Sequence, residues 1–244
     1  MSICVTGGSS GLGRAIAERF APGGNHVFVN YHANDAAAAE TAASIESLGG
    51  IPHLIKADVG TPEGCQELMR EVGKHVDRLD QLVHAAAKAA TGATLTIDPQ
   101  ELTEAITLNG TALVYLVQAA LPLLQRGSSV YYISSRGSRI VIPNYVALGT
   151  AKALGEHIMR YLAVELAPRG IRANTVSPGA VDTAAFRAMF PDNWQQRLEA
   201  AAKANPSGRG VKVEDAADVV WLLSQPGFEM VQGQIIGVDG GVSL

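Results

Sequence analysis

The sequence contains few cysteines and no long apolar run. Its two cysteines, Cys4 and Cys65, are too few for a disulfide framework, and no Cys/His spacing typical of a zinc site is present. No apolar run approaches the ~20 residues that cross a bilayer, and a predicted strand begins at Ile3, which leaves no room for a signal peptide. These absences predict a protein of the reducing cytoplasm, neither exported nor inserted in a membrane.

Blocks of like charge are missing as well. The chain has 19 Lys and Arg against 23 Asp and Glu, a net charge of -4, so its long-range field repels the phosphates of nucleic acids. Charged residues make up 17% of the chain and hydrophobic ones 47%, within the range of globular proteins. We therefore expect a folded protein that does not bind nucleic acid.

Short apolar runs alternate with longer amphipathic or alanine-rich segments, the pattern of repeated βα units on a parallel sheet. No repeat or linker interrupts this series. We expect a single α/β domain over residues 1–244, a Rossmann-type doubly wound parallel sheet of about seven strands flanked by helices. The predicted strands lie near residues 3–5, 26–31, 52–55, 81–83, 130–133, 171–176 and 234–238. The predicted helices lie near residues 13–20, 35–48, 62–76, 99–124, 145–167 and 214–223, and residues 183–210 form one long irregular insertion.

A glycine-rich segment, residues 5–13, separates the first predicted strand from the first helix. Gly7 would allow a turn with positive φ, Gly11 a close approach of the backbone to phosphate, and Gly13 close packing of helix on strand. The helix N-terminus beside them would attract a dinucleotide's pyrophosphate. Such a string alone is also compatible with an ordinary tight βα turn.

Further motifs follow in a fixed order. The TGxxxGxG spacing of residues 6–13 resembles the short-chain dehydrogenase/reductase family, as do Asp58-Val59, Ser177-Pro178-Gly179 with Thr183, and the closing Val238-Asp239-Gly240-Gly241. The resemblance covers the chain from Ile3 to Leu244 and implies a nicotinamide-dependent oxidoreductase. The cofactor-binding residues that it implies are Gly7, Ser9, Ser10, Gly11, Leu12, Gly13, Asn30, His32, Asp58, Val59, Ala85, Ala86, Lys152, Pro178, Gly179, Val181 and Thr183.

One motif departs from the family. The fourth predicted strand ends in His84-Ala85-Ala86-Ala87, where the family usually has Asn-Asn-Ala-Gly. Small residues still allow the cofactor's ribose to lie against the backbone, but the usual asparagine side-chain bonds are lost. We expect His84 to be a packing residue at the end of the strand and not a catalytic one.

The family's catalytic tyrosine is also missing from its usual place. In the family a Tyr donates a proton, a Lys four residues later holds the ribose and lowers the pKa of that Tyr, a Ser polarises the substrate carbonyl, and an Asn supports a relay water. Lys152 matches the Lys, but Leu148 occupies the Tyr position. Ser135 matches the Ser, and Asn109 matches the Asn, although a local helix irregularity would also explain an asparagine there.

Tyr145 offers a phenol seven residues before Lys152. On a helix this interval is nearly two turns, so both side chains share a face, and the phenol moves about 4.5 Å along the axis from position 148. The YxxxxxxK spacing resembles the enoyl-acyl carrier protein reductase subgroup. A displaced donor suits conjugate reduction, because the oxygen of an enoyl thioester lies two carbons beyond the carbon that takes the hydride. The catalytic residues so implied are Tyr145, Lys152, Ser135 and Asn109.

Two alternatives remain open. Standard enoyl reductases often carry a second aromatic residue at position 135, so Ser135 is compatible with a carbonyl reductase or alcohol dehydrogenase, such as a 3-oxoacyl thioester reductase. The missing tyrosine at position 148 and the altered fourth-strand motif are compatible with a cofactor-binding regulator without turnover, although retention of Ser135, Tyr145, Lys152 and Asn109 argues against it.

The remaining expectations concern substrate, cofactor and assembly. Phe186, Met189, Phe190 and Trp194 predict an apolar substrate lid over residues 183–210, suited to an acyl chain, and Arg187, Arg197 and Lys203 could meet an acyl carrier protein or the phosphates of coenzyme A. The second strand lacks the acidic residue that binds a ribose 2′-hydroxyl, which favours NADPH over NADH. Ser9, Ser10, Asn30 or His32 would then hold the 2′-phosphate. The family resemblance also implies a homotetramer, formed through the helices at residues 99–124 and 145–167.

Overall fold

The computed structural model describes residues 1–244 and contains one sheet of seven parallel strands, in the order β3-β2-β1-β4-β5-β6-β7. The strand order reverses between β1 and β4, which places a crevice at the carboxyl ends of these two strands. The predicted doubly wound fold is therefore confirmed. The strands are β1 (Ser2–Thr6), β2 (His26–Tyr31), β3 (Ile51–Lys56), β4 (Leu79–His84), β5 (Leu124–Ile133), β6 (Arg172–Pro178) and β7 (Ile235–Val238).

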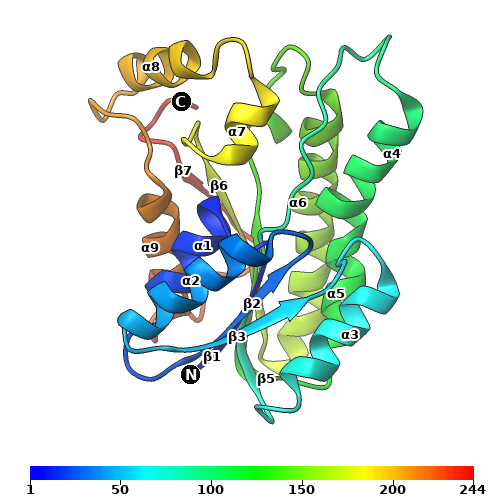
Figure 1. The fold of residues 1–244 in the computed structure, drawn as a ribbon, viewed down its shortest axis with the longest axis vertical. Helices are drawn as coiled ribbons and strands as arrows, with labels where there is room; N and C mark the ends of the chain where they lie inside the picture. The colour runs from blue at the N-terminus through cyan, green and yellow to red at the C-terminus, as the bar shows by residue number, and fades with distance from the viewer.

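Helices cover both faces of this sheet (Figure 1). One face packs against α1 (Gly11–Arg19), α2 (Asp35–Ser47) and α9 (Val213–Ser224), and the core between them includes Ile16, Phe20 and Val220. The other face packs against α3 (Pro62–Val72), α5 (Ala112–Ala120) and α6 (Val146–Leu166), around Leu68, Leu113 and Leu116. Because both faces are buried, the central strands are nearly continuous hydrophobic runs, as parallel sheets require.

The prediction of one continuous helix over residues 99–124 is wrong. The chain forms α4 (Pro99–Ile106), a π-helical segment (Thr107–Thr111) and α5, and Leu124 already belongs to β5. Asn109 and Gly110, both poor helix formers, lie in the π-helical segment. A Cβ on Gly110 would lie 3.0 Å from the Leu154 side chain, so glycine allows this segment to approach α6 closely.

Residues 183–210 are not an irregular insertion, because they contain α7 (Ala184–Met189) and α8 (Trp194–Ala204). The Thr183 side chain caps α7 by accepting a hydrogen bond from the Phe186 amide. Both helices lie beyond the carboxyl ends of the strands, at the top of the view in Figure 1. No helix in the structure is long and apolar enough to cross a membrane.

Candidate active site

A cavity of about 610 Å³ lies at the crevice between the glycine-rich turn, the end of β5, the start of α6 and the two helices α7 and α8. The structure brings many of the predicted site residues to its wall. The predicted residues that do not line it are Asn30, Asp58, Val59, Ala86 and Asn109. The predicted residues that line the cavity are Gly7, Ser9, Ser10, Gly11, Leu12, Gly13, His32, Ala85, Ser135, Tyr145, Lys152, Pro178, Gly179, Val181 and Thr183.

The glycine-rich turn leaves no room for larger residues. Gly7 has a φ of 64°, and a Cβ there would lie 2.7 Å from the Ala86 Cα. A Cβ on Gly13 would lie 2.3 Å from the Gly7 carbonyl oxygen. Ser10 precedes α1 without making a side-chain cap, so the amides at the start of this helix are available to a ligand. The cradle therefore fits the pyrophosphate of a dinucleotide, bound at the positive end of α1.

At the end of β2 the structure separates two residues that were predicted to bind the same phosphate. Asn30 is only 1% exposed, and its amide nitrogen donates to the carbonyls of Ile55 at 3.3 Å and Ala57 at 3.0 Å. These bonds turn Asn30 toward β3 and away from the cavity. His32 lines the cavity, as does Tyr31, which the sequence analysis did not single out.

The phenol of Tyr145 lies against the end of β5. Its hydroxyl donates a hydrogen bond to the Ser135 Oγ at 3.1 Å, and the Gly137 amide donates to the same oxygen at 3.2 Å. A Cβ on Gly137 would lie 2.4 Å from the Tyr145 ring, so a glycine is needed beneath it. Burial raises the pKa of Tyr145, while the bond to Ser135 lowers it. Tyr145 precedes the first turn of α6, which begins at Val146 and not at residue 145.

The ammonium group of Lys152 is hydrogen-bonded to β5 and not to the phenol of Tyr145. Lys152 is buried in α6, and its Nζ donates to the Ile133 carbonyl at 2.7 Å and lies 4.7 Å from the centre of the Tyr132 ring. Burial lowers the pKa of Lys152 to about 7, opposed by the negative charge of Glu156. In this arrangement the pKa of Tyr145 is governed by burial and by Ser135, not by Lys152 as the family resemblance implied.

Asn109 lies in the π-helical segment, beside the loop that follows β4. Its Oδ1 accepts from the Lys88 amide at 3.2 Å, and its Nδ2 donates to the carbonyls of Lys88 at 3.0 Å and Ala105 at 2.8 Å. The Asn109 carbonyl accepts the hydroxyl proton of Tyr132. Both its side chain and its carbonyl are thus bonded within the protein, which its place in the sequence does not indicate.

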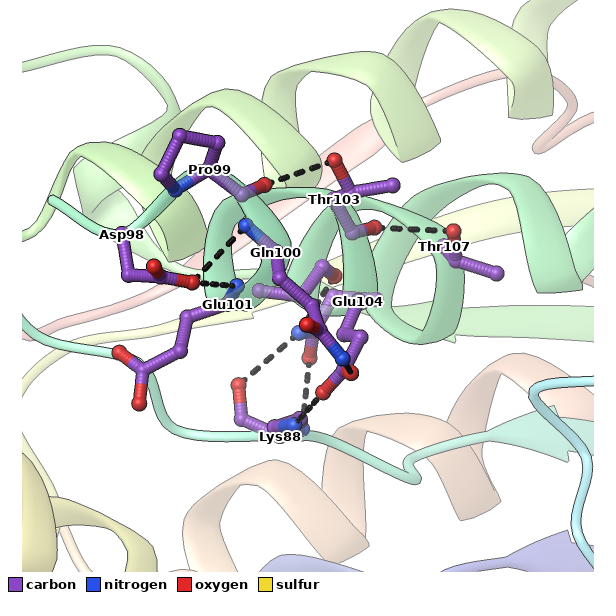
Figure 2. A network of polar contacts seen from close by, with 10 residues as sticks. Lys88, Asp98, Pro99, Gln100, Glu101, Thr103, Glu104 and Thr107 are labelled. Carbon is purple, nitrogen blue, oxygen red and sulfur yellow. Dashed lines mark hydrogen bonds and ion pairs between the residues drawn. The ribbon is translucent and has the colours of Figure 1, made fainter.

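Helix α4 contacts the loop after β4 through the side chain of Lys88, as Figure 2 shows. The Lys88 ammonium pairs with the Glu104 carboxylate, and Gln100 donates to Glu104 at 2.9 Å. Asp98 caps the helix by accepting from the amides of Gln100 at 2.9 Å and Glu101 at 3.0 Å. The Lys88 backbone that binds Asn109 is therefore anchored by its own side chain.

His84 does more than pack at the end of β4. Its two ring nitrogens lie 2.9 Å from the Thr6 Oγ1 and 3.0 Å from the Leu108 carbonyl. Thr6 Oγ1 in turn accepts from the amides of Ala85 and Ala86. Burial and the charge of Lys152 lower the pKa of His84 to about 4, so the ring is neutral at pH 7. A histidine thus links β1, β4 and the π-helical segment.

The lid predicted from the sequence contributes an aromatic wall next to the phenol. The Phe190 ring lies nearly parallel to that of Tyr145, with 6.3 Å between centroids and 8° between planes, and Phe186 meets Phe190 edge-on at 5.0 Å. Arg197 of α8 covers Phe190, with its guanidinium carbon 4.1 Å from the ring centre. The phenol therefore faces an apolar surface formed by Phe190 and Phe186.

The fold and the cavity define a nicotinamide-dependent oxidoreductase of the doubly wound type. A family model described as enoyl-(acyl carrier protein) reductase matches residues 7–243, and the chain belongs to this family of short-chain dehydrogenases/reductases.

The chain is similar to 1-cyclohexenylcarbonyl-CoA reductase of Streptomyces collinus, with 34% identity over 98% of this chain and 86% of the relative. Among solved structures it is similar to a short-chain dehydrogenase of Burkholderia cenocepacia in complex with NADP, with a TM-score of 0.91, 28% identity and coverage of 99% and 97% of the two chains. It is also similar to an angucycline C-6 ketoreductase with bound NADP, with a TM-score of 0.90, 31% identity and coverage of 99% and 95%.

Proposed function

We propose that the protein is an NADPH-dependent reductase of the C=C bond in 2-enoyl thioesters. The observation that carries this proposal is the pairing of Tyr145 with Ser135, in a chain whose usual donor position holds Leu148. A hydrocarbon at position 148 transfers no proton. The phenol at position 145 is the proton donor that the cavity pairs with Ser135, and its displacement matches an oxygen that lies two carbons beyond the hydride acceptor.

The nicotinamide of NADPH would supply a hydride to the β-carbon. The electron pair of the C=C bond then shifts toward the thioester carbonyl, and the proton of the Tyr145 hydroxyl passes to the carbonyl oxygen. Ser135 Oγ already accepts hydrogen bonds from Tyr145 and from the Gly137 amide, so its own hydroxyl proton is free to stabilise the same oxygen. In the tautomerisation of the resulting enol the α-carbon takes a proton from solvent, and the enol O–H proton returns to the Tyr145 phenolate.

The cofactor would lie along the glycine-rich turn. The amides at the start of α1 would bind its pyrophosphate, Ala85 and Lys152 would contact the nicotinamide ribose, and residues 178–183 the nicotinamide. His32, Ser9 and Ser10 remain to hold the 2′-phosphate, because the amide of Asn30 is bonded to β3. Strand β2 ends without an acidic residue, which favours NADPH over NADH.

Residues 183–210 would act as the lid over a substrate carried by coenzyme A or an acyl carrier protein. The apolar surface of Phe186 and Phe190 suits an acyl group. Arg197 lines the cavity, and its Nε bonds only the neutral Asn193 side chain. Its charge is thus available to an anionic carrier. The Streptomyces relative, named as a CoA reductase, supports a thioester substrate.

We also propose a cytoplasmic homotetramer formed by a single domain. Helix α6 exposes Tyr161 by 63% and Val164 by 74%, an apolar surface suited to contact with a second copy. Cys4 and Cys65 are both free and buried, in keeping with a reducing compartment. Sedimentation at micromolar concentration should give a tetramer, and a monomer would contradict the proposed assembly.

The test follows the label from NADPH deuterated at the transferring position into a short trans-2-enoyl thioester. We expect a saturated product with deuterium at the β-carbon and a solvent hydrogen at the α-carbon. The second candidate is a carbonyl reductase, supported by Ser135 and by the similarity to an angucycline ketoreductase. Reduction of a β-ketoacyl thioester or ketone, with deuterium on the carbinol carbon and no turnover of the enoyl thioester, would establish that candidate instead.

A further inference from the structure

A buried carboxylate that the proposed chemistry does not use lies behind the cavity. Glu156 is 6% exposed and follows Lys152 by one turn of α6. Its Oε1 accepts hydrogen bonds from the hydroxyls of Ser134 and Ser138, each at 2.6 Å. A carboxylate is costly to bury, and these two hydrogen bonds offset part of that cost.

The two serines bound by Glu156 enclose the residue that contacts Tyr145. Ser134 immediately precedes Ser135, and Ser138 ends the short 3-10 helix Arg136–Ser138 that follows it. Gly137, within this helix, lies directly under the Tyr145 ring. Glu156 therefore ties both ends of the turn, residues 134–138, to α6. The position of Ser135 relative to the phenol depends on that tie.

The same carboxylate acts on Lys152 through its charge. Burial lowers the pKa of Lys152, and the negative charge of Glu156 is what raises it in opposition. The other titratable groups near Lys152 are Tyr132 beneath its ammonium, and His84 of β4, whose low pKa leaves it neutral at pH 7. Neither supplies a negative charge at neutral pH.

We propose that Glu156 is a positioning residue, which holds the turn of Ser135 in place for Tyr145 and provides the counter-charge of Lys152. Glu156 does not line the cavity. The effect of Glu156 on turnover rests on the proposed function, whereas its effect on the charge of Lys152 is independent of the substrate.

Two variants separate the two roles. Glu156→Gln keeps an oxygen that accepts from both serines but removes the charge, and Ser138→Ala removes one hydrogen bond but keeps the charge. The ε-carbon chemical shift of Lys152, followed against pH in protein labelled with ¹³C-lysine and assigned with Lys152→Arg, reports the charge directly. We expect Glu156→Gln to lower the titration midpoint of Lys152 by about one pH unit and Ser138→Ala to leave it in place.

Enzyme kinetics should also distinguish the two variants, because Ser138→Ala should change the size of kcat and Glu156→Gln the pH profile of kcat/KM. We expect Ser138→Ala to lower kcat about tenfold at every pH, with an unchanged pH profile. Glu156→Gln should move the alkaline fall of kcat/KM to lower pH and leave the rate at acidic pH closer to that of the unmodified protein.

An unchanged lysine midpoint in Glu156→Gln, or an unchanged kcat in Ser138→Ala, would overturn the corresponding role. Should Glu156→Gln not fold, Glu156→Asp serves instead. Its side chain is one methylene shorter, so the negative charge lies further from Lys152 and the titration midpoint of Lys152 must still fall. If no enoyl thioester is turned over, the proposed function fails, and the titration of Lys152 continues to decide the role of Glu156.

Discussion

The hydroxyl of Tyr145 lies 3.1 Å from the Ser135 Oγ and donates its proton to it, which pairs the start of α6 with the end of β5. Both residues line the cavity, and Tyr145 lies three residues before position 148, where the family's usual tyrosine would stand. The two hydroxyl groups of the proposed reaction are therefore adjacent, so that one substrate oxygen could contact both.

Removal of the phenol should abolish most of the proton transfer while sparing the cofactor. For Tyr145→Phe we expect kcat with an enoyl thioester to fall by about a hundredfold or more, with little change in the Kd of NADPH. Leu148→Ala is the control, because it loses packing and no proton donor. Steady-state kinetics and fluorescence titration check both. An inactive, folded Leu148→Ala beside an active Tyr145→Phe would show that the donor is misassigned.

A methyl group under the phenol should displace it. In Gly137→Ala the new Cβ would lie 2.4 Å from the Tyr145 ring, so the ring or the turn beneath it must shift and disturb the contact with Ser135. We expect a loss of kcat of about tenfold or more. Gly237→Ala in β7 is the matched control, because no atom lies within 4 Å of its added Cβ. Equal activity of the two variants would contradict the need for this tyrosine position.

Two arginines of the lid should differ in their response to the thioester carrier. Arg187 is neutralised by two bonds to Asp182, at 2.7 and 2.9 Å, whereas Arg197 lines the cavity without an acidic partner. We expect Arg197→Gln to raise KM about tenfold for an enoyl-CoA and to leave the neutral N-acetylcysteamine thioester of the same acyl group unaffected. Arg197→Lys should restore part of the loss, and Arg187→Gln should have little effect. Equal losses with both thioesters would mean that Arg197 supports the lid and not the carrier.

Cofactor preference should be visible in the melting temperature. At equal concentrations NADPH should raise it more than NADH does, because tighter binding to the folded state stabilises it by mass action. His32→Ala should reduce the shift caused by NADPH and leave that caused by NADH, since His32 lines the cavity beside the expected 2′-phosphate. A larger shift with NADH in the unmodified protein would reverse the assignment of the cofactor.

Acid should weaken the fold through two histidines. Burial, together with neighbouring positive groups, lowers the pKa of both His53 and His84 to about 4, against ~6.5 in an unfolded chain. Between these values the unfolded state binds more protons, so this stabilisation is complete above about pH 6.5 and is lost as the pH falls toward 4. Melting temperatures between pH 4 and 7 should therefore fall less steeply in His53→Gln than in the unmodified protein. An identical slope would remove His53 from the explanation.

The doubly wound parallel sheet and the glycine-rich turn that lines the cavity could be predicted from the sequence. Their causes are local. The alternation of apolar and amphipathic segments specifies βα units, and the steric demands at Gly7 and Gly13 arise within one turn. Hydrophobic periodicity carries such information because it depends on residues only a few positions apart.

Only the tertiary structure decided how the side chains of the site are bonded. Asn30 turns toward β3, Asn109 is bonded by its side chain to Lys88 and by its carbonyl to Tyr132, and Glu156 holds Ser134 and Ser138. The partners in these contacts lie 18 to 27 residues apart in sequence. A polar side chain that is removed from water must take whichever donors or acceptors the packing of neighbouring elements brings within reach, and that choice is made after the elements have formed.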